Sequence, residues 1–373
     1  MTRTRWKSAL PALLALALVV AACGDDDATT TTAGTAATTT TVAATTTTAA
    51  ATTTTEAPNP YEGETLEMLI GFSAGGGNDL VSRIVAQYLG QELGANIVPV
   101  NEPGAGGLAA ANSAFTAGAS DGSVVVNTSQ SLVLAQALED ETVLYDHAAL
   151  HWLGSVSSLP VVCVTRTGAG YTSIDELIDG PAVPVGATAP GSIPFDSAVA
   201  INGAVGTNFN VITGYEGSSE ILLAIERGEL DGLCIALIPA ILEWIQTGFA
   251  VPLVVMGEVP AGQDDWEAAL EGVPRAGDLA EGAQAQELLT AVQGPNDMVY
   301  AYAVHPDTPA DRVAALQAGF EAMLANPDFA TAMEDLGRIF APKTAAEVQT
   351  LVESILSLSP ETAQLLRDLR EGN

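Results

Sequence analysis

The sequence predicts an α/β fold with two lobes, each a sheet flanked by helices. Two observations lead to this prediction. After residue 60, short apolar runs alternate with segments of helical periodicity, which is typical of a largely parallel sheet covered by helices. The part of the chain that can fold, about 61–373, is also long enough for two lobes.

The segment before residue 61 is not expected to belong to either lobe. Arg3, Arg5 and Lys7 precede an uncharged run that is too short to cross roughly 30 Å of hydrocarbon as a helix, so residues 1–22 resemble a signal peptide. Cys23 follows small residues, as in the bacterial lipobox, and we expect it to be lipidated. Residues 23–60 are then a disordered tether, because Thr and Ala dominate them without apolar periodicity.

The first lobe is predicted to begin with an apolar strand at 66–72 and a glycine-rich turn at 73–79. A helix at 80–93 follows, because Leu80, Ile84, Tyr88 and Leu89 recur at helical spacing, with Asn78 or Asp79 as its N-cap. A second strand leads through a glycine-rich turn at 103–107 into an alanine-rich helix. These further elements are expected as strands at 97–100 and 124–127, a long apolar run at 153–164, and a helix at 108–115.

The later elements continue the same alternation. Strands are expected at 183–187, 211–215, 230–235, 251–256 and 298–304, and helices after Pro194, at 218–227, and in a tail with caps at Asp311 and Thr344. Crossings between the lobes are expected near 161–165 and 300–304. Residues 61–160 plus 298–373 would then form lobe 1, and residues 161–297 would form lobe 2.

The charge of the chain excludes some partners. It has 12 Lys and Arg against 45 Asp and Glu, and removal of the three basic residues of the signal peptide leaves a net charge near −36. Nucleic acid and an anionic membrane surface are therefore not expected as partners.

Cysteine and histidine give little support for a metal site. Cys163 and Cys234 lie in apolar, strand-like runs and are either buried thiols, which we favour slightly, or one disulfide. His147, His151 and His305 are scattered, and neither HExxH nor CxxC spacing occurs. No metal and no cofactor are expected.

Two glycine-rich turns resemble catalytic or cofactor motifs. Residues 71–75 satisfy GxSxG, the nucleophile elbow of serine hydrolases, with Ser73 as the nucleophile, but no strand precedes this one to build an oxyanion hole. Residues 104–109 match the weak dinucleotide pattern GxGxxA, yet the next strand ends at Asn127 without the acid that would hold a ribose.

A third interpretation needs no catalyst. Each turn would direct backbone N–H groups and a helix N-terminus, which carries about half a positive charge, toward a shared cleft. Such a site binds carboxylate or phosphate without Lys or Arg, which are scarce in this chain. We expect a noncatalytic, monomeric binding protein; an exported hydrolase using Ser73 is the alternative, and adhesion through the tether is a third possibility.

The ordered series of turns resembles the Bug family, the TctC-like binding proteins of tripartite tricarboxylate transporters. Segment 72–79 is similar to the family's PFAAGGGTD, 101–107 to ENRPGAGG, and 121–122 to the start of PDGYT. Further matches are 186–192 with GSxGxGS, 214–218 with PYKGS, 228–231 with GGEVD, and 304–309 with APAGTP.

The resemblance implies a two-lobed, periplasmic-binding-protein-like (Venus flytrap) fold and a carboxylate held between the turns at 72–79 and 188–192. The lipobox implies location on the outer face of the cell membrane, and the resemblance implies delivery of the ligand to integral membrane transporter subunits. The ligand-binding residues implied are Phe72, Ser73, Ala74, Gly75, Gly76, Gly77, Asn78, Asp79, Thr128, Ser129, Thr188, Gly191, Ser192 and Tyr215.

Three residues depart from the family pattern. Gly71 replaces Pro, Phe195 stands where His is usual, and Glu216 stands where Lys is common. The last two would make the pocket less basic and more apolar. We therefore expect a mono- or dicarboxylate, aromatic acids included, rather than a tricarboxylate.

Overall fold

The computed structural model describes residues 59–178 and 180–372, and residues 57–373 form one compact unit. The predicted signal peptide, the lipidation site Cys23 and nearly all of the tether lie outside the described residues. Across those two ranges, no helix combines the length and the apolar character needed to cross a membrane.

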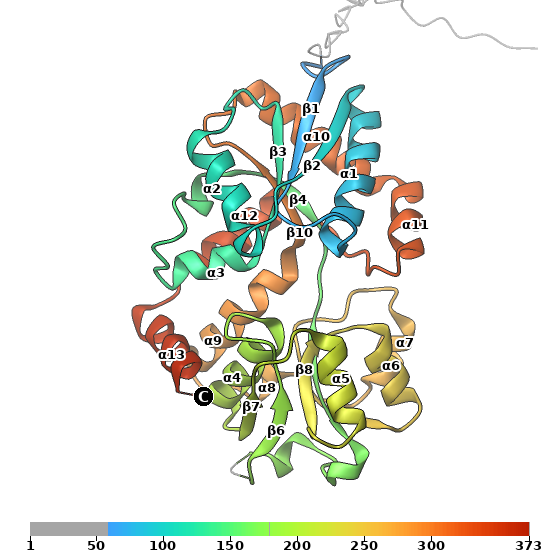
Figure 1. Cartoon of the computed structure of the whole chain (residues 1–373), viewed down its shortest axis with the longest axis vertical. Coiled ribbons are helices and arrows are strands. Elements are labelled where there is room, and N and C mark those ends of the chain that lie inside the picture. The colour runs from blue at the N-terminus through green and yellow to red at the C-terminus, as the bar shows by residue number, and fades with distance from the viewer. Residues whose placement is uncertain (1–58, 179, 373) are drawn as a thin grey trace, which may run out of the picture. The chain divides into compact units, whose positions relative to one another are not determined.

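The first sheet has six strands in the order β11-β4-β10-β3-β1-β2 (Figure 1). Its strands are β1 (Thr65–Ile70), β2 (Asn96–Asn101), β3 (Val124–Thr128), β4 (His151–Ser157), β10 (Val299–Val304) and β11 (Lys343–Thr344). β1 pairs with β2 and β3 in parallel, whereas β10 pairs antiparallel with β3 and β4. The parallel strands therefore all end at the edge where β10 begins.

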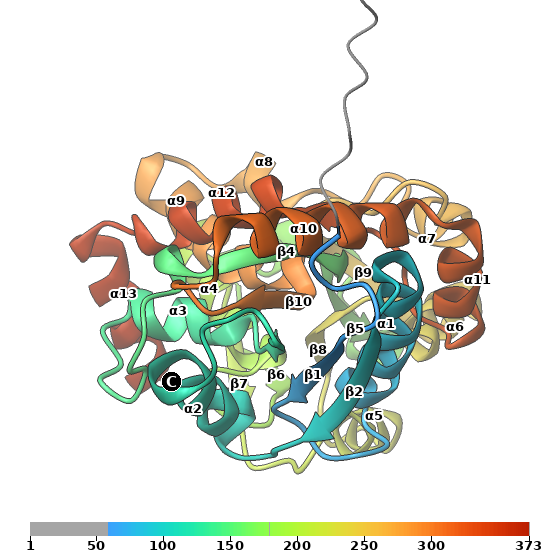
Figure 2. The same ribbon diagram turned by 90° about the horizontal axis from the view of Figure 1, so that it is seen from above.

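Helices cover both faces of this sheet, which the view from above in Figure 2 shows. One face packs on α1 (Gly77–Leu93), α10 (Ala310–Ala325) and α11 (Pro327–Asp335). The other face packs on α2 (Leu108–Ala117), α3 (Ser131–Ala137) and α12 (Ala345–Leu356).

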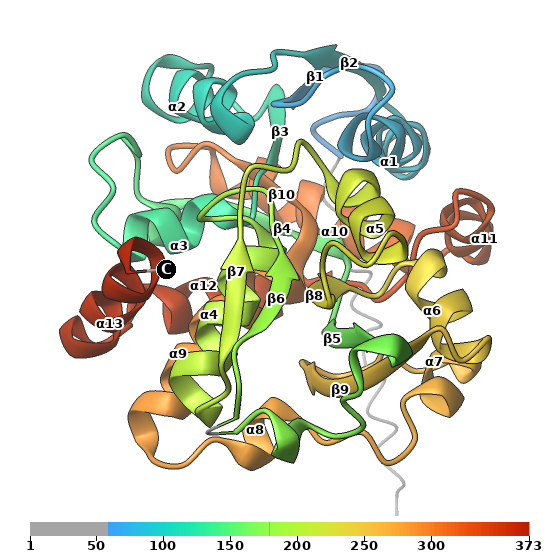
Figure 3. The same cartoon turned by 60° about the horizontal axis from the view of Figure 1, so that its bottom comes forward.

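The second sheet has five strands in the order β7-β6-β8-β5-β9 (Figure 3). Its strands are β5 (Val161–Arg166), β6 (Val183–Gly186), β7 (Phe209–Ile212), β8 (Gly232–Ala236) and β9 (Ala250–Met256). One face packs on α4 (Ile193–Val205), α8 (Ala276–Leu279), α9 (Ala283–Gln293) and α13 (Pro360–Glu371). The other packs on α5 (Ser218–Glu226), α6 (Pro239–Gln246) and α7 (Asp264–Ala269).

The predicted α/β class with a helix-flanked sheet in each half is confirmed, but both sheets are mixed rather than purely parallel. β5 pairs antiparallel with β8 and β9, as β10 does with its neighbours. These are the strands that follow a passage from one sheet to the other. The parallel strands of each sheet end at the edge that faces the other sheet. A strand that enters across this edge runs in the opposite direction, so it pairs antiparallel with them.

The chain passes between the sheets at different residues from those predicted. Residues 161–165 belong to β5 and residues 300–304 to β10, so the passages lie just before them, at 158–160 and 294–298. The two passages are bonded to each other: Leu159 donates its N–H to the Asn296 carbonyl at 2.8 Å, and Ser158 bonds Asp297 at 3.1 Å. Pro160 breaks the predicted run 153–164 into two strands, because it has no N–H to donate.

A third passage connects α12 to α13. The final helix lies beside α4 and α9 of the second sheet (Figure 1), where Leu366 is fully buried. Ser359 donates its N–H and its hydroxyl to the Glu287 carboxylate at 2.6 Å each, which fixes the start of α13 on α9. The division of the chain into lobes stays a prediction, but α13 packs with the helices of residues 161–297.

Helix α1 begins three residues earlier than predicted, and its buried face is different. Its N-cap is Gly76, so neither Asn78 nor Asp79 has that role. Val81, Val85 and Leu89 face the sheet, whereas Leu80 is 39% exposed. Leu89 belongs to the predicted set too, but Val81 and Val85 take the buried positions expected for Leu80 and Ile84. The buried face is therefore shifted by one residue from Leu80 to Val81.

Predictions for the remaining helix caps had mixed outcomes. Thr344 caps α12 in a capping box with Glu347, as expected. Asp311 is not the cap of α10: Pro309 is, and Asp311 lies in the first turn.

The expectation of free thiols is wrong, because Cys163 and Cys234 form a disulfide. The two cysteines are direct partners in the antiparallel register of β5 and β8. They are 71 residues apart in sequence, so only the strand pairing reveals that they meet.

Candidate functional site

The first predicted turn lies between β1 and α1, at the edge of the sheet where the parallel strands end. Ser73, Ala74, Gly75 and Gly76 are exposed, and Gly77 opens the 17-residue helix. The N-cap Gly76 offers no side chain to the first N–H groups of the helix. These uncapped N–H groups and the helix dipole favour an anion at this end of α1.

Asp79 holds this turn in shape. It is 2% exposed and accepts hydrogen bonds from the Gly75 N–H at 2.8 Å, Arg83 Nε at 2.9 Å and Asn101 Nδ2 at 2.9 Å. The bond from Arg83, with those from Gly75 and Asn101, lowers the pKa of Asp79 to about 2 despite its burial. The carboxylate oxygens of Asp79 are occupied by donors of the protein itself. Asp79 therefore positions the turn.

The second glycine-rich turn supports the first. A Cβ on Gly71 would lie 2.6 Å from Cα of Gly107, so a side chain or a proline ring at position 71 would clash with that backbone. This close approach explains why Gly71 replaces the family proline. Gly107 has φ 94° and also lies against the Phe72 ring and Ser129. The GxGxxA match is therefore a packing element for Phe72 rather than a dinucleotide loop.

The residues that end β3 lie next to these turns. Thr128 and Ser129 are 2% and 7% exposed, and Ser129 Oγ is 2.9 Å from Ser131 Oγ. Their positions follow from the pairing of β3 with β1, which brings the ends of both strands to one edge.

The third predicted turn, 188–192, precedes α4 in the second sheet and is built like the first. Ser192 is the N-cap of α4, but its hydroxyl donates to the Ala189 carbonyl at 2.6 Å, so this helix also begins without a capping side chain. Asp196 in the first turn accepts the Gly191 N–H at 3.1 Å. Arg370 of α13 pairs with both oxygens of Asp196, at 3.0 and 2.5 Å.

The remaining predicted residues of the second sheet differ in their surroundings. The Thr188 carbonyl accepts the Gly214 N–H at 3.1 Å. Tyr215 packs beside the core behind α5, and burial, with the nearby charges of Glu229 and Glu220, raises its pKa. Two carboxylates near the Tyr215 hydroxyl disfavour an anionic ligand at that position. Phe195 is 1% exposed and belongs to the core.

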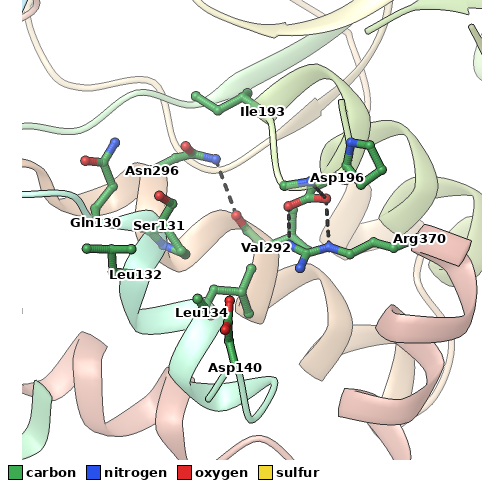
Figure 4. Close-up of a pocket in the computed structure, with 14 residues that line it drawn as sticks. Gln130, Ser131, Leu132, Leu134, Asp140, Ile193, Asp196, Val292, Asn296 and Arg370 are labelled. Carbon is green, nitrogen blue, oxygen red and sulfur yellow. Dashed lines mark hydrogen bonds and ion pairs between the residues drawn. The ribbon is translucent and has the colours of Figure 1, made fainter. Parts of the chain in front are cut away.

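A pocket of about 290 Å³ is lined by α3, α4, the end of α9 with the residues after it, and α13 (Figure 4). It brings together residues that follow β3 with residues of the 188–192 turn. Its polar and turn residues include Gln130, Ser131, Gly191, Asp196, Asn296 and Arg370. Gly191 is thus the only predicted ligand-binding residue that lines this pocket, and residues 72–79 do not line it.

The histidines have partners away from Ser73. His147 is fully buried and bonds Gln136 at 2.7 Å, and burial lowers its pKa to about 4. His151 Nε2 donates to the Pro306 carbonyl at 2.9 Å, and His305 accepts the Asp307 N–H at 3.1 Å. None of these contacts brings a base to Ser73. Within the described ranges there is also no group of three or more His, Cys, Asp or Glu residues suited to a metal.

Sequence reasoning missed several residues that shape these turns. Arg83 lies four residues after Asp79, a spacing that could have indicated the pair. Arg370 lies 174 residues from Asp196, and no sequence signal connects them. Arg338 and Tyr300 were also missed, although both lie against Gly77 at the start of α1.

The fold is that of the periplasmic solute-binding proteins. The chain superposes on a ligand-free TctC solute-binding protein from Polaromonas with a TM-score of 0.66 and 18% identity, covering 82% of this chain and 98% of that one. MatC from Rhodopseudomonas palustris with bound malate gives a TM-score of 0.54 and 20% identity, covering 81% and 99%.

The chain belongs to the tripartite tricarboxylate transporter receptor family (TctC), whose sequence profile matches residues 81–352, well over half of the chain. Protein BugT of Bordetella pertussis is 27% identical over 215 residues, which cover 52% of this chain and 61% of BugT. The chain thus spans about six tenths of the curated relative that it matches. The predicted family is confirmed, and its proteins are extracytoplasmic solute-binding proteins.

Proposed function

We propose that this chain is a lipid-anchored receptor that binds a small carboxylate between its two sheets and delivers it to the membrane subunits of a tripartite tricarboxylate transporter. Family membership is the observation that carries the proposal. The malate bound to MatC supports a carboxylate as ligand.

The local structure supports an anion site built mainly from backbone groups. Both α1 and α4 start without a capping side chain, and each is preceded by a glycine turn held by a buried aspartate. Each aspartate is itself paired with an arginine, so its charge is compensated where a ligand carboxylate would approach. Helix termini of this kind bind carboxylates without a further cation.

Thermal unfolding with a panel of acids tests ligand binding. Malate, adipate, benzoate and citrate would each be added to the mature chain, with malamide as the uncharged control. We expect at least one acid to raise Tm and malamide to leave it unchanged; at a concentration of 100 Kd the stabilisation is about 2.7 kcal/mol. No shift with any acid, confirmed by calorimetry, would exclude carboxylate binding.

The same panel tests the expected size of the ligand. A mono- or dicarboxylate should bind more tightly than citrate. Tight binding of citrate without binding of the smaller acids would contradict this expectation.

Anchoring and the absence of catalysis need separate tests. Labelled fatty acid should be incorporated into the parent and lost in Cys23→Ala, and equal labelling of both would contradict lipidation at Cys23. A fluorophosphonate probe should leave the chain unlabelled. Labelling that disappears in Ser73→Ala would instead favour the hydrolase.

A further inference from the structure

Arg338 is unusual among the arginines of this acidic chain. Eight arginines lie in the described ranges, and six of them form an ion pair with a carboxylate; Arg227 and Arg338 do not. Arg227 is exposed to solvent, but the Nε of Arg338 is buried and has no hydrogen-bond partner among the described residues. A buried, unpaired guanidinium donor is unfavourable unless a partner arrives.

The guanidinium lies at the uncapped end of α1. A Cβ placed on Gly77 would be 3.0 Å from Arg338 Nη2 and 3.4 Å from the Tyr300 hydroxyl oxygen. Both polar groups therefore converge on the first residue of the helix, where the dipole favours negative charge. Only glycine at position 77 leaves this space open without a side chain between them.

Tyr300 provides a second, independent indication of a ligand. Its side chain is 7% exposed, and no hydrogen bond of its hydroxyl group is found among the described residues. The hydroxyl oxygen itself is not fully buried, so it can bond an incoming group beside Gly77. Its φ of 56° is in the left-handed region, which non-glycine residues rarely adopt.

A cavity adjoins Arg338 and connects the two halves of the chain. Its volume is about 330 Å³, and the residues that line it on the side of the first sheet are Gly337, Arg338 and Ile339. On the side of the second sheet, Leu237, Pro239 and Trp266 form apolar walls, and Gln263 adds one amide group. Glu334 is its only carboxylate and is exposed. A cation at one end and apolar walls at the other suit an acid with an apolar body.

We propose that Arg338 and Tyr300 form the subsite that anchors the ligand's carboxylate beside Gly77, with the apolar body of the acid directed toward Trp266. This inference rests on the proposed function, because it assigns the anchor and the body of the same ligand. The guanidinium supplies charge-assisted hydrogen bonds, the tyrosine hydroxyl donates one more, and the start of α1 adds its dipole.

Substitutions that remove or retain the donor groups test the anchor. The acid that binds the parent most tightly among malate, adipate, benzoate and citrate would be titrated into Arg338→Gln, Arg338→Lys and Tyr300→Phe by calorimetry. We expect Arg338→Gln and Tyr300→Phe to weaken binding about tenfold or more, because each loses a hydrogen bond to a charged group. Arg338→Lys should retain part of the affinity. The matched controls are Arg227→Gln and Tyr88→Phe, which should change Kd by less than about twofold.

Trp266 gives a second measurement that does not depend on those variants. Addition of the acid should change tryptophan emission in the parent and in Trp244→Phe, and the change should be absent in Trp266→Phe. An emission change that persists in Trp266→Phe would place the ligand elsewhere.

The two proposals fail differently. If the parent binds an acid and the Arg338 and Tyr300 variants bind it equally well, the subsite is wrong and carboxylate binding stands. If the parent binds none of the acids, the proposed function fails and the subsite fails with it.

Discussion

Asp79 and Asp196 have the same local role in the two halves of the chain. Each is a buried residue in the first turn of a helix, accepts the N–H of a glycine in the preceding turn, and pairs with an arginine. The arginine of the first pair is on the same helix, whereas that of the second comes from the far end of the chain. A similar arrangement is thus obtained from two different sequences, with the glycine four residues before Asp79 and five residues before Asp196.

Asp79→Asn should destabilise the chain by about 1–2 kcal/mol at pH 7, since the pKa of Asp79 falls to about 2 in the folded state. A carboxyl with a lowered folded pKa stabilises the fold above its unfolded pKa, near 4, and the contribution is lost as pH falls toward 2. Urea unfolding at pH 7, 5 and 3 should therefore show a difference between parent and variant that shrinks in acid.

Asp311→Asn is the control for that measurement. Asp311 also lies in the first turn of a helix, but it is exposed. It should change stability little at each pH. A difference for Asp79→Asn that is the same at every pH would show that the charge of Asp79 is not what stabilises the turn.

At the scale of single residues, sequence reasoning identified positions more successfully than roles. The glycines and Asp79 were recognised, but Asp79 is engaged by Gly75, Arg83 and Asn101 rather than left open. Phe195 was expected in the pocket and lies in the core. Arg338 gave no signal, because its meaning depends on a contact with Gly77, which is 261 positions away in sequence.

At the scale of elements, α13 is connected to the second glycine turn by one side chain. Arg370→Gln should weaken this connection, because it leaves Asp196, 5% exposed, without its cation. We expect a loss of about 2–4 kcal/mol, together with faster amide exchange in α13 and in residues 188–192.

Arg367→Gln is a matched control on the same helix. Arg367 pairs with the exposed Glu139 at 3.7 Å, so its loss should cost less than about 1 kcal/mol. Equal effects of the two substitutions would show that the contact between Arg370 and Asp196 does not hold the turn.

Most elements were predicted from periodicity, and the errors have identifiable physical causes. The face of α1 was predicted correctly at Leu89 but misassigned at Leu80, because several apolar residues satisfy the same helical spacing and only packing selects Val81 and Val85. The run 153–164 hid a passage between sheets, because both flanking strands are apolar. The disulfide depended on a strand register that periodicity does not contain.

At the scale of the whole molecule, the large negative charge should affect how fast a ligand binds. The chain carries a formal charge of −33, so an acid approaches against a repulsive field at low ionic strength. At about 0.15 M salt the Debye length is about 8 Å, and this field is largely screened. Stopped-flow fluorescence should show an association rate that rises severalfold between low and physiological salt. A rate that falls with added salt would mean that local positive charge dominates the approach.

The packing of α13 on α4 and α9 determines how this protein can be dissected. A fragment of residues 161–297 expressed alone would lack α13, whose buried Leu366 packs in the core beside α4 and α9 and whose Arg370 pairs with Asp196. It would expose an apolar strip and leave one carboxylate uncompensated, which favours aggregation. A soluble excised half would instead need Pro360–Glu371 joined back through a short linker, as a permuted chain.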